Sequence, residues 1–362
     1  MRRQAFVLLA ASAAIAAAVP GCTTLSYYSQ AIGGHLDVMR RAEPVGEAIA
    51  TGATPEATRA KLERALAIRD YASAELGLPD NGSYRRYADL GRPYVVWNVF
   101  AAPEFEVRAE ESCFPVAGCV TYRGYYSRED ADRAAAAMKA RGFDVFVGGV
   151  PAYSTLGWFD DPLLSTFINY PDPELARLMF HELAHQVVYV KGDTTFNESF
   201  AVAVEEEGVR RWLATRGTPV DAERSARGQM IRQQFIELVA RYRERLAKLY
   251  AEPLSDADKR AGKVRLFAEM KADYAALKRD WGGFSGYDPY LAEANNAFLA
   301  SIATYNDLVP AFRALLAAEG GDLPRFYAAA MAIARLPESD RAAQLAALAG
   351  GAKAVSAGTV SQ

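Results

Sequence analysis

The chain has 362 residues, of which 51% are hydrophobic and 23% are charged, and its formal net charge is −3. These are the values of an ordinary globular protein that is long enough to bury a large core. They exclude the strongly basic composition that identifies nucleic-acid-binding proteins, so we expect no nucleic acid among the partners.

Residues 1–21 have the pattern of a signal peptide. Two arginines precede Ala5–Val19, an apolar stretch too short to span a membrane comfortably. Val19-Pro20-Gly21-Cys22 then resembles a bacterial lipobox, which implies cleavage before Cys22 and a lipid on its thiol. Because Thr23 follows, we expect an exported chain that is anchored through Cys22, at the outer membrane and facing the periplasm. The alternative is a plain secretory signal with an incidental cysteine.

Residues 22–90 predict a helical N-terminal segment. Apolar residues at helical spacing indicate one helix over residues 24–42 and a second that starts at Thr54-Pro55-Glu56 and reaches about Leu76. His35 lies on the first of these helices, and we interpret it as a packed or solvated residue.

Residues 91–217 predict an α/β catalytic part with a small sheet. Residues 93–100 are β-branched and aromatic, as in a strand, and Glu129–Arg141 has the composition of a helix. Residues 143–147 alternate as a second strand, which we expect Gly148-Gly149 to end.

Cys113 and Cys119 are the other two cysteines of the chain. Because an exported protein folds in an oxidising compartment, we expect them to form a disulfide. Metal binding is the weaker alternative, since no histidine is near them in the sequence and their spacing is not typical of zinc sites.

From residue 172 onward the pattern is helical almost throughout, so the expected fold class is α+β, mainly α. One helix should start at Asp172-Pro173 and end near Lys191, and a second should run from about Thr195 to Gly217. Residues 218–349 predict a helical part that opens with two long antiparallel helices, and residues 350–362 predict a disordered tail. The apolar stripe expected on the second long helix is Val264, Phe267, Tyr274, Leu277 and Trp281.

The helix that starts near residue 172 contains His181-Glu182-Leu183-Ala184-His185, which uses two of the three histidines in the chain. Residues four apart lie one turn apart on the same face of a helix. Both imidazoles can therefore bind one metal ion, with Glu182 beside them to handle a proton. This is the pattern of a zinc hydrolase.

A catalytic zinc site needs a third protein ligand and one open position. A third histidine cannot follow the longer zincin pattern, because Val188 and Lys191 stand at the positions concerned. We expect the motif helix to continue about five residues, or roughly 7.5 Å, past His185, so that an antiparallel return helix brings Glu198 back to its level.

Glu198 has a second interpretation. Thr195-Phe196-Asn197-Glu198 fits a capping box, in which the Glu198 side chain would bond to the backbone N–H of Thr195. Glu205 is the competing carboxylate and would suit a hydrogen bond to a motif histidine. Glu206 and Glu207 should point to solvent.

The motif His181–His185 followed by Asn197-Glu198-x-x-Ala201 resembles the glutamate-zincins, metallopeptidases whose third ligand is such a glutamate. More narrowly, the chain resembles a bacterial lipoprotein family of predicted aminopeptidases. The resemblance implies a zincin-like metallopeptidase core, a Zn²⁺ ion held by His181, His185 and Glu198, and a peptide substrate. The gap from His185 to Glu198 is shorter than in well-known glutamate-zincins, so the resemblance does not imply that this chain has their substrate clefts. The other segments that carry the narrower resemblance are Cys113 to Cys119 with residues 122–125, residues 153–159, and residues 295–297 with 305–306.

The expected reaction is hydrolysis of a peptide bond by zinc-bound water, with Glu182 as the general base that then passes the proton to the leaving amine. Tyr305 and Tyr290 are candidates for the further donor that the oxyanion needs. Residues 153–157 are a candidate edge strand for an extended substrate, and an ordinary structural role is an equal alternative. Glu205 or Asp160 is the candidate for binding a substrate ammonium.

The leading hypothesis is a membrane-anchored zinc aminopeptidase. An envelope endopeptidase or amidase is the alternative within the same class of enzyme. A non-catalytic lipoprotein that uses a zincin scaffold for binding or assembly is the alternative outside it. The intact Glu182 disfavours this last hypothesis, because a purely structural metal site needs no proton acceptor.

Overall fold

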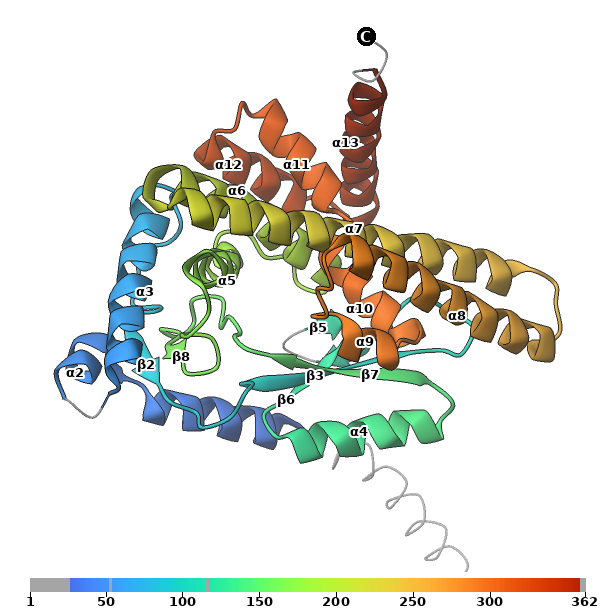
Figure 1. The fold of residues 1–362 in the computed structure, drawn as a ribbon, viewed down its shortest axis with the longest axis horizontal. Helices are drawn as coiled ribbons and strands as arrows, with labels where there is room; N and C mark the ends of the chain where they lie inside the picture. The colour runs from blue at the N-terminus through green and yellow to red at the C-terminus, as the bar shows by residue number, and fades with distance from the viewer. Residues whose placement is uncertain (1–26, 52–53, 115–117, 359–362) are drawn as a thin grey trace, which may run out of the picture.

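The computed structural model describes residues 27–51, 54–114 and 118–358. Within these residues the chain is mainly helical, with small sheets in its first half, which confirms the expected α+β, mainly α class (Figure 1). The predicted signal peptide and Cys22 lie outside the described residues. In the described part, no helix combines the length and the apolar character that a bilayer crossing requires.

The described part of the N-terminal segment is largely helical and also contains two short strands. A helix over residues 27–41 comes first, followed by α2 (Val45–Ala50) and α3 (Glu56–Ala74). Within the expected start Thr54-Pro55-Glu56, it is Pro55 that takes the N-cap position of α3, and no side chain caps the helix.

A three-stranded sheet joins this segment to the chain just before the motif helix. Its middle strand is β2 (Arg86–Ala88), which pairs antiparallel with β1 (Glu43–Pro44) and parallel with β8 (Leu163–Leu164). The N-terminal segment is therefore tied to the chain directly upstream of the motif helix.

A second sheet is built around β3 (Val96–Ala102), which pairs antiparallel with β6 (Arg123–Tyr125) and β7 (Asp144–Val150). Helix α4 (Arg128–Ala140) packs on one face of this sheet and α10 (Asn296–Asn306) on the other (Figure 1). Because both faces are covered, every residue of β3 is buried, which explains why all of them except Asn98 are apolar.

The prediction that Gly148-Gly149 ends the second strand was wrong, because β7 continues through both glycines to Val150. The ring of Tyr94 packs directly on the backbone at Gly149, where a Cβ atom would come within 2.3 Å of Tyr94 Cδ2. Gly149 therefore provides room for the Tyr94 ring and does not end the strand.

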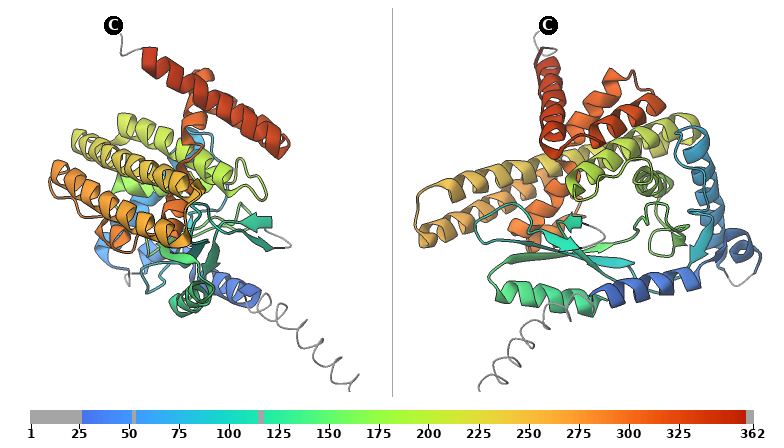
Figure 2. Two further views of the ribbon diagram at one scale, coloured as in Figure 1. Left: turned by 90° about the vertical axis from the view of Figure 1, so that its right-hand side faces the viewer. Right: turned by 180° about the vertical axis from the view of Figure 1, so that it is seen from behind.

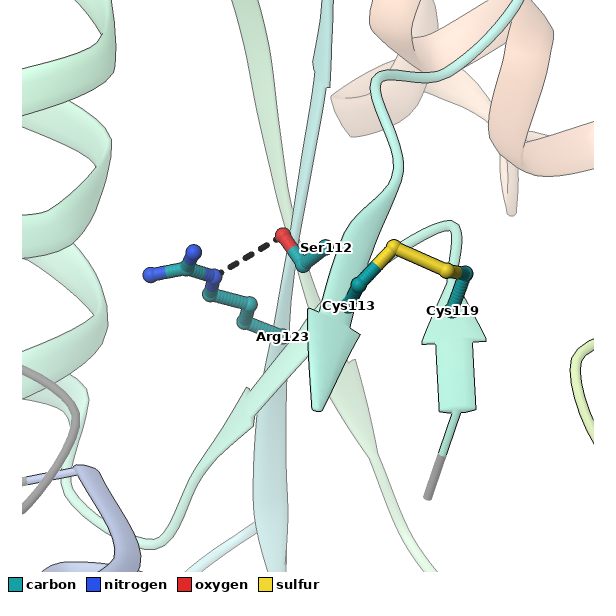
Figure 3. Close-up of a disulfide and its surroundings, with 4 residues drawn as sticks. All are labelled: Ser112, Cys113, Cys119 and Arg123. Carbon is teal, nitrogen blue, oxygen red and sulfur yellow. Dashed lines mark hydrogen bonds between the residues drawn. A yellow bond between two sulfur atoms is a disulfide. The ribbon is translucent and has the colours of Figure 1, made fainter. Parts of the chain in front are cut away.

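A short hairpin of β4 (Ser112–Phe114) and β5 (Gly118–Val120) carries the disulfide between Cys113 and Cys119, which confirms that prediction (Figure 3). Arg123 Nε donates a hydrogen bond to Ser112 Oγ at 2.9 Å, which ties the hairpin to the start of β6.

The motif helix α5 (Asp172–Ala184) packs along α6 (Thr194–Arg216). Close approach is possible because Gly208 leaves room for Phe180, whose Cδ2 would lie 2.7 Å from a Cβ atom at that position. These helices share one hydrophobic core with residues from Val38 to Leu345. That core crosses the segment boundaries expected at residues 90 and 217.

The two long helices α7 (Pro219–Ala251) and α8 (Asp256–Asp280) pack side by side; α7 also packs on α10, and the connected ends of the pair project to one side of the molecule (Figure 1). One member of the expected stripe on α8 was wrong, since Val264 is 70% exposed. Leu266 and Met270 take the buried positions, two turns and one turn before Tyr274, so the buried stripe is shifted around the helix.

Past α9 (Asp288–Ala292) and α10, the helices α11 to α13 lie on the side of α6 opposite to the sheet of β3 (Figure 2). The last helix continues to Gly358, beyond the start of the expected polar tail at residue 350, and residues 359–362 lie outside the described part. The bounds of these helices are Val309–Ala318 for α11, Leu323–Ala334 for α12 and Glu338–Gly358 for α13.

Candidate metal centre

Three side chains converge where α5 meets α6. His181 and His185 stand one turn apart on α5, with ring centroids 4.9 Å apart. Glu198 Oε2, from the second turn of α6, lies 3.2 Å from His181 Nε2 and 3.6 Å from His185 Nε2. One potential ligand atom from each residue falls within 4.8 Å of the others, so all three can reach one ion.

Glu198 reaches this point by a different route from the one expected. Helix α5 ends at Ala184, with His185 as its C-cap, and does not continue to about Lys191. The chain leaves the helix there because the Gln186 amide bonds to two side chains of an upstream loop, with Asn81 Nδ2 at 2.7 Å and Ser83 Oγ at 3.3 Å.

Asn197 then fixes the returning chain. Its Nδ2 donates to the backbone carbonyl of Val190 at 2.8 Å, and its Oδ1 accepts from the N–H of Val190 at 2.7 Å. This pair of hydrogen bonds holds the connecting loop against the first turn of α6. The residue after Asn197 is thereby directed toward the histidines.

Helix α6 is capped by Asp193 rather than by Thr195, because the Asp193 carboxylate accepts a hydrogen bond from the N–H of Phe196. The capping-box interpretation of Glu198 therefore does not hold. Its carboxylate, 7% exposed as a residue, is left to face the two imidazoles.

Glu205 lies two turns further along α6 and is 1% exposed. Its Oε2 is 2.8 Å from His181 Nδ1, and Oε1 is 3.3 Å from guanidinium nitrogens of both Arg177 and Arg232. A neutral His181 that donates its Nδ1–H to Glu205 must carry its lone pair on Nε2, the nitrogen beside Glu198. Glu205 thus occupies the supporting position that the sequence suggested for it.

The electrostatics of the group favour a bound cation. Burial lowers the pKa of His181, but the hydrogen bonds to Glu198 and Glu205 outweigh it and raise that pKa to about 10. Burial raises the pKa of Glu198, but the charge of His185 and hydrogen bonds to both imidazoles outweigh it and lower the pKa to about 2. The site therefore holds positive charge strongly, and its two imidazole nitrogens and one carboxylate are a donor set that suits zinc.

Glu182 points into the same cavity from α5. Burial raises the pKa of its carboxyl, although the neighbouring charges of His181 and His185 oppose this. A carboxylate with a raised pKa is a better proton acceptor than one exposed to water.

The three converging residues and Glu182 line a cavity of about 780 Å³, a volume sufficient for a short peptide segment. Two tyrosines, Tyr122 and Tyr305, line it beside Glu198. Burial, followed by the charge of Glu198, raises the pKa of both phenols well above the usual range, so both stay protonated donors.

The structure also shows where other residues named in the sequence analysis lie relative to the cavity. Tyr290 lies outside the cavity, 41% exposed and stacked on Phe298. Residues 153–157 form an irregular loop along the cavity wall and no strand. His35 is packed against this loop, as expected, with Nδ1 2.8 Å from Tyr153 Oη.

The expectation for Glu206 and Glu207 was wrong in part, because both are half-buried. They do not point freely into solvent, since Glu206 pairs with Arg313, and Glu207 with two arginines on its own helix.

Three residues of this site were not predicted as site residues. Arg177 precedes His181 by one helical turn, so helical spacing could have indicated it. Arg232 comes from α7, and Tyr122 entered only as part of the resemblance of residues 122–125; no local pattern assigns either residue to the site.

Three comparisons with known proteins bear on the chain. A search of curated proteins found no match, and a search of solved structures found none either. The model of a family described as "Putative aminopeptidase" matches residues 26–345. Since this match spans most of the sequence, the chain belongs to the putative aminopeptidase family.

Proposed function

We propose that this protein is a zinc-dependent metallopeptidase, anchored to a membrane through Cys22, that removes residues from the amino termini of peptides. One observation carries the proposal: His181, His185 and Glu198 bring three ligand atoms within 4.8 Å of one another, with Glu182 beside them in the same cavity. Membership of a family described as aminopeptidases supports a peptidase reaction. The anchor rests on the sequence pattern around Cys22.

A zinc ion held by these residues would supply a Lewis acid that polarises the scissile carbonyl and lowers the pKa of water beside it. Glu182 accepts a proton from the water as its oxygen forms a bond to the carbonyl carbon. The protonated Glu182 then gives that proton to the amine nitrogen as the C–N bond breaks, so the products are a carboxylic acid and an amine.

The tyrosines complete the site in this proposal. The carbonyl oxygen gains negative charge when water adds, and a fixed donor nearby stabilises that charge. In this proposal the donor is Tyr305, from α10, or Tyr122, from the chain after the disulfide hairpin, because both residues line the cavity. Their raised pKa values keep the hydroxyl protons in place at neutral pH.

One observation favours an endopeptidase as the second candidate. Among the described residues that line the cavity, the carboxylates are Glu182, Glu198 and Glu205. Glu205 is already bonded to His181 and two arginines, and Asp160 is exposed and outside the lining. No carboxylate of that lining is thus left for a substrate ammonium, a group that only an aminopeptidase must bind.

The test uses matched peptides with free and with N-acetylated amino termini. The proposal predicts zinc-dependent cleavage that requires the free amine, and about a 100-fold or larger loss in Glu182→Gln with zinc retained. Glu206→Gln, which changes a carboxylate bonded to Arg313 at the surface, is the control and should keep full activity. Equal cleavage of acetylated peptides would favour the endopeptidase, and cleavage by Glu182→Gln at the wild-type rate would contradict both.

A further inference from the structure

Four large apolar side chains are exposed on two segments that touch. Ile32 and Leu36 stand one turn apart on the helix over residues 27–41, with 60% and 43% of their surface exposed. Trp158 and Phe159 follow the loop along the cavity wall and are 83% and 51% exposed. We call these four residues the apolar patch. The remaining exposed large apolar residues of the described chain are spread over residues 189–290, so this is the place where they concentrate.

The two segments are fixed to each other by His35, which lies between Ile32 and Leu36 in the sequence. Its ring centroid is 4.6 Å from that of Phe159, and its Nδ1 is 2.8 Å from Tyr153 Oη. The apolar patch is therefore a continuous feature of the folded surface and does not depend on a separate movement of the loop.

The same segments form part of the cavity wall on their inner side. Tyr27 and Ala31 of the helix line the cavity, as do Tyr153, Ser154 and Leu156 of the loop. Whatever covers the apolar patch will therefore lie directly behind one wall of the candidate active site.

We propose that the apolar patch rests in the interfacial layer of a phospholipid bilayer. Tyr27, the first described residue, follows Cys22 by five residues, and Ile32 lies five helical residues further on, so a lipid on that thiol would keep the nearest residue of the patch within roughly 26 Å of the membrane surface. Tryptophan favours the interface between headgroups and acyl chains, and the aliphatic pair suits the acyl boundary. Arg40, exposed one turn after Leu36, adds a cation for anionic headgroups.

This arrangement goes beyond an anchor, because it sets the orientation of the enzyme. With the apolar patch on the bilayer, the cavity wall formed by residues 153–156 lies next to the membrane surface. The enzyme would then meet peptides at that surface rather than peptides far from it.

Trp158 makes the proposal directly measurable. The other three tryptophans, Trp97, Trp212 and Trp281, are at most 7% exposed, so contact with lipid will alter the fluorescence of Trp158 first. The full chain is reconstituted into phosphatidylethanolamine and phosphatidylglycerol vesicles with brominated acyl chains, which quench tryptophan at the interface. The result does not depend on zinc or on hydrolysis.

We expect bromolipid quenching in the wild type that disappears in Trp158→Phe and falls at least twofold in the double variant Ile32→Ser, Leu36→Ser. Val264→Ser, which changes a valine 70% exposed on α8, is the matched control and should quench as the wild type does. Absence of quenching in vesicle-bound wild type, or equal quenching in the double variant, would overturn the proposal. A Trp158 emission shift caused by peptide alone, or by protein concentration alone, would assign the patch to substrate or to a second copy and would also overturn it.

Discussion

Replacing Glu205 by glutamine tests separately whether this residue supports the proposed metal ligands and whether it stabilises the fold. The Glu205 carboxylate contacts His181 Nδ1 at 2.8 Å and the guanidinium groups of Arg177 and Arg232 at 3.3 Å each. Glutamine has the same shape and keeps one acceptor for His181, but it carries no charge. The imidazole thereby keeps an acceptor for its Nδ1–H but loses the negative charge that raises its basicity.

The magnitude follows from these contacts. Loss of a carboxylate that supports a histidine ligand weakens metal binding by about 10- to 100-fold, or about 1.4 to 2.7 kcal/mol. Breaking a buried ion pair costs about 3 to 5 kcal/mol. We expect the lower end for the metal-free fold, because Arg177 keeps a second bond to Glu174 Oε2 at 2.8 Å.

Two assays measure the two effects. Competition with a chromophoric zinc chelator gives the metal affinity, and urea unfolding of the metal-free protein gives the free energy of unfolding. Glu206→Gln is the matched control, since the neighbouring carboxylate pairs with Arg313 near the surface, where a pair contributes about 0 to 1 kcal/mol. If Glu205→Gln bound zinc within twofold of the wild type while losing the stability, Glu205 would be a structural residue and the reasoning would be refuted.

Three further predictions concern other parts of the molecule. Burial raises the pKa of Asp161 to about 7 against hydrogen bonds from Thr155, so the folded state binds its proton more tightly than the unfolded state does. The free energy of unfolding should therefore fall as pH rises from about 4 to 7, by about 4 kcal/mol at most. Asp161→Asn should remove this pH dependence in urea unfolding, and an unchanged pH dependence in that variant would contradict the prediction. Gly149→Ala should lower the free energy of unfolding by about 1 to 3 kcal/mol, because its Cβ would collide with the Tyr94 ring, and wild-type stability would contradict that packing. Tyr122→Phe and Tyr305→Phe should each lower kcat by about 10- to 1000-fold with little change in KM, whereas a loss confined to KM would indicate substrate binding alone.

Local patterns in the sequence were sufficient to predict which side chains lie together at the centre of the candidate site. Residues four apart on a helix must share a face, so the pairing of His181 with His185 follows from helical geometry alone. The same period places Glu205 two turns from Glu198, and the structure brings both to His181. Such predictions succeed because they depend only on the chain within one helix.

The predictions that failed depend on contacts between distant residues. No glycine or proline marks the end of α5, which is set by hydrogen bonds from Gln186 to a loop about a hundred residues upstream. Gly149 resembles a strand breaker until the ring of Tyr94 is placed against it. The position of Tyr122 depends on the disulfide hairpin before it and on the sheet of β3, and no short motif encodes that arrangement.

The zinc content of the purified chain after dialysis tests the proposed metal centre most directly. We expect about one zinc ion per chain in the wild type and in Glu206→Gln, and a loss of nearly all of it in Glu198→Gln, whose side chain keeps the size of the ligand without its charge. A folded wild type that retains no zinc, or a Glu198→Gln variant that retains as much as the wild type, would contradict the claim that His181, His185 and Glu198 form the metal centre.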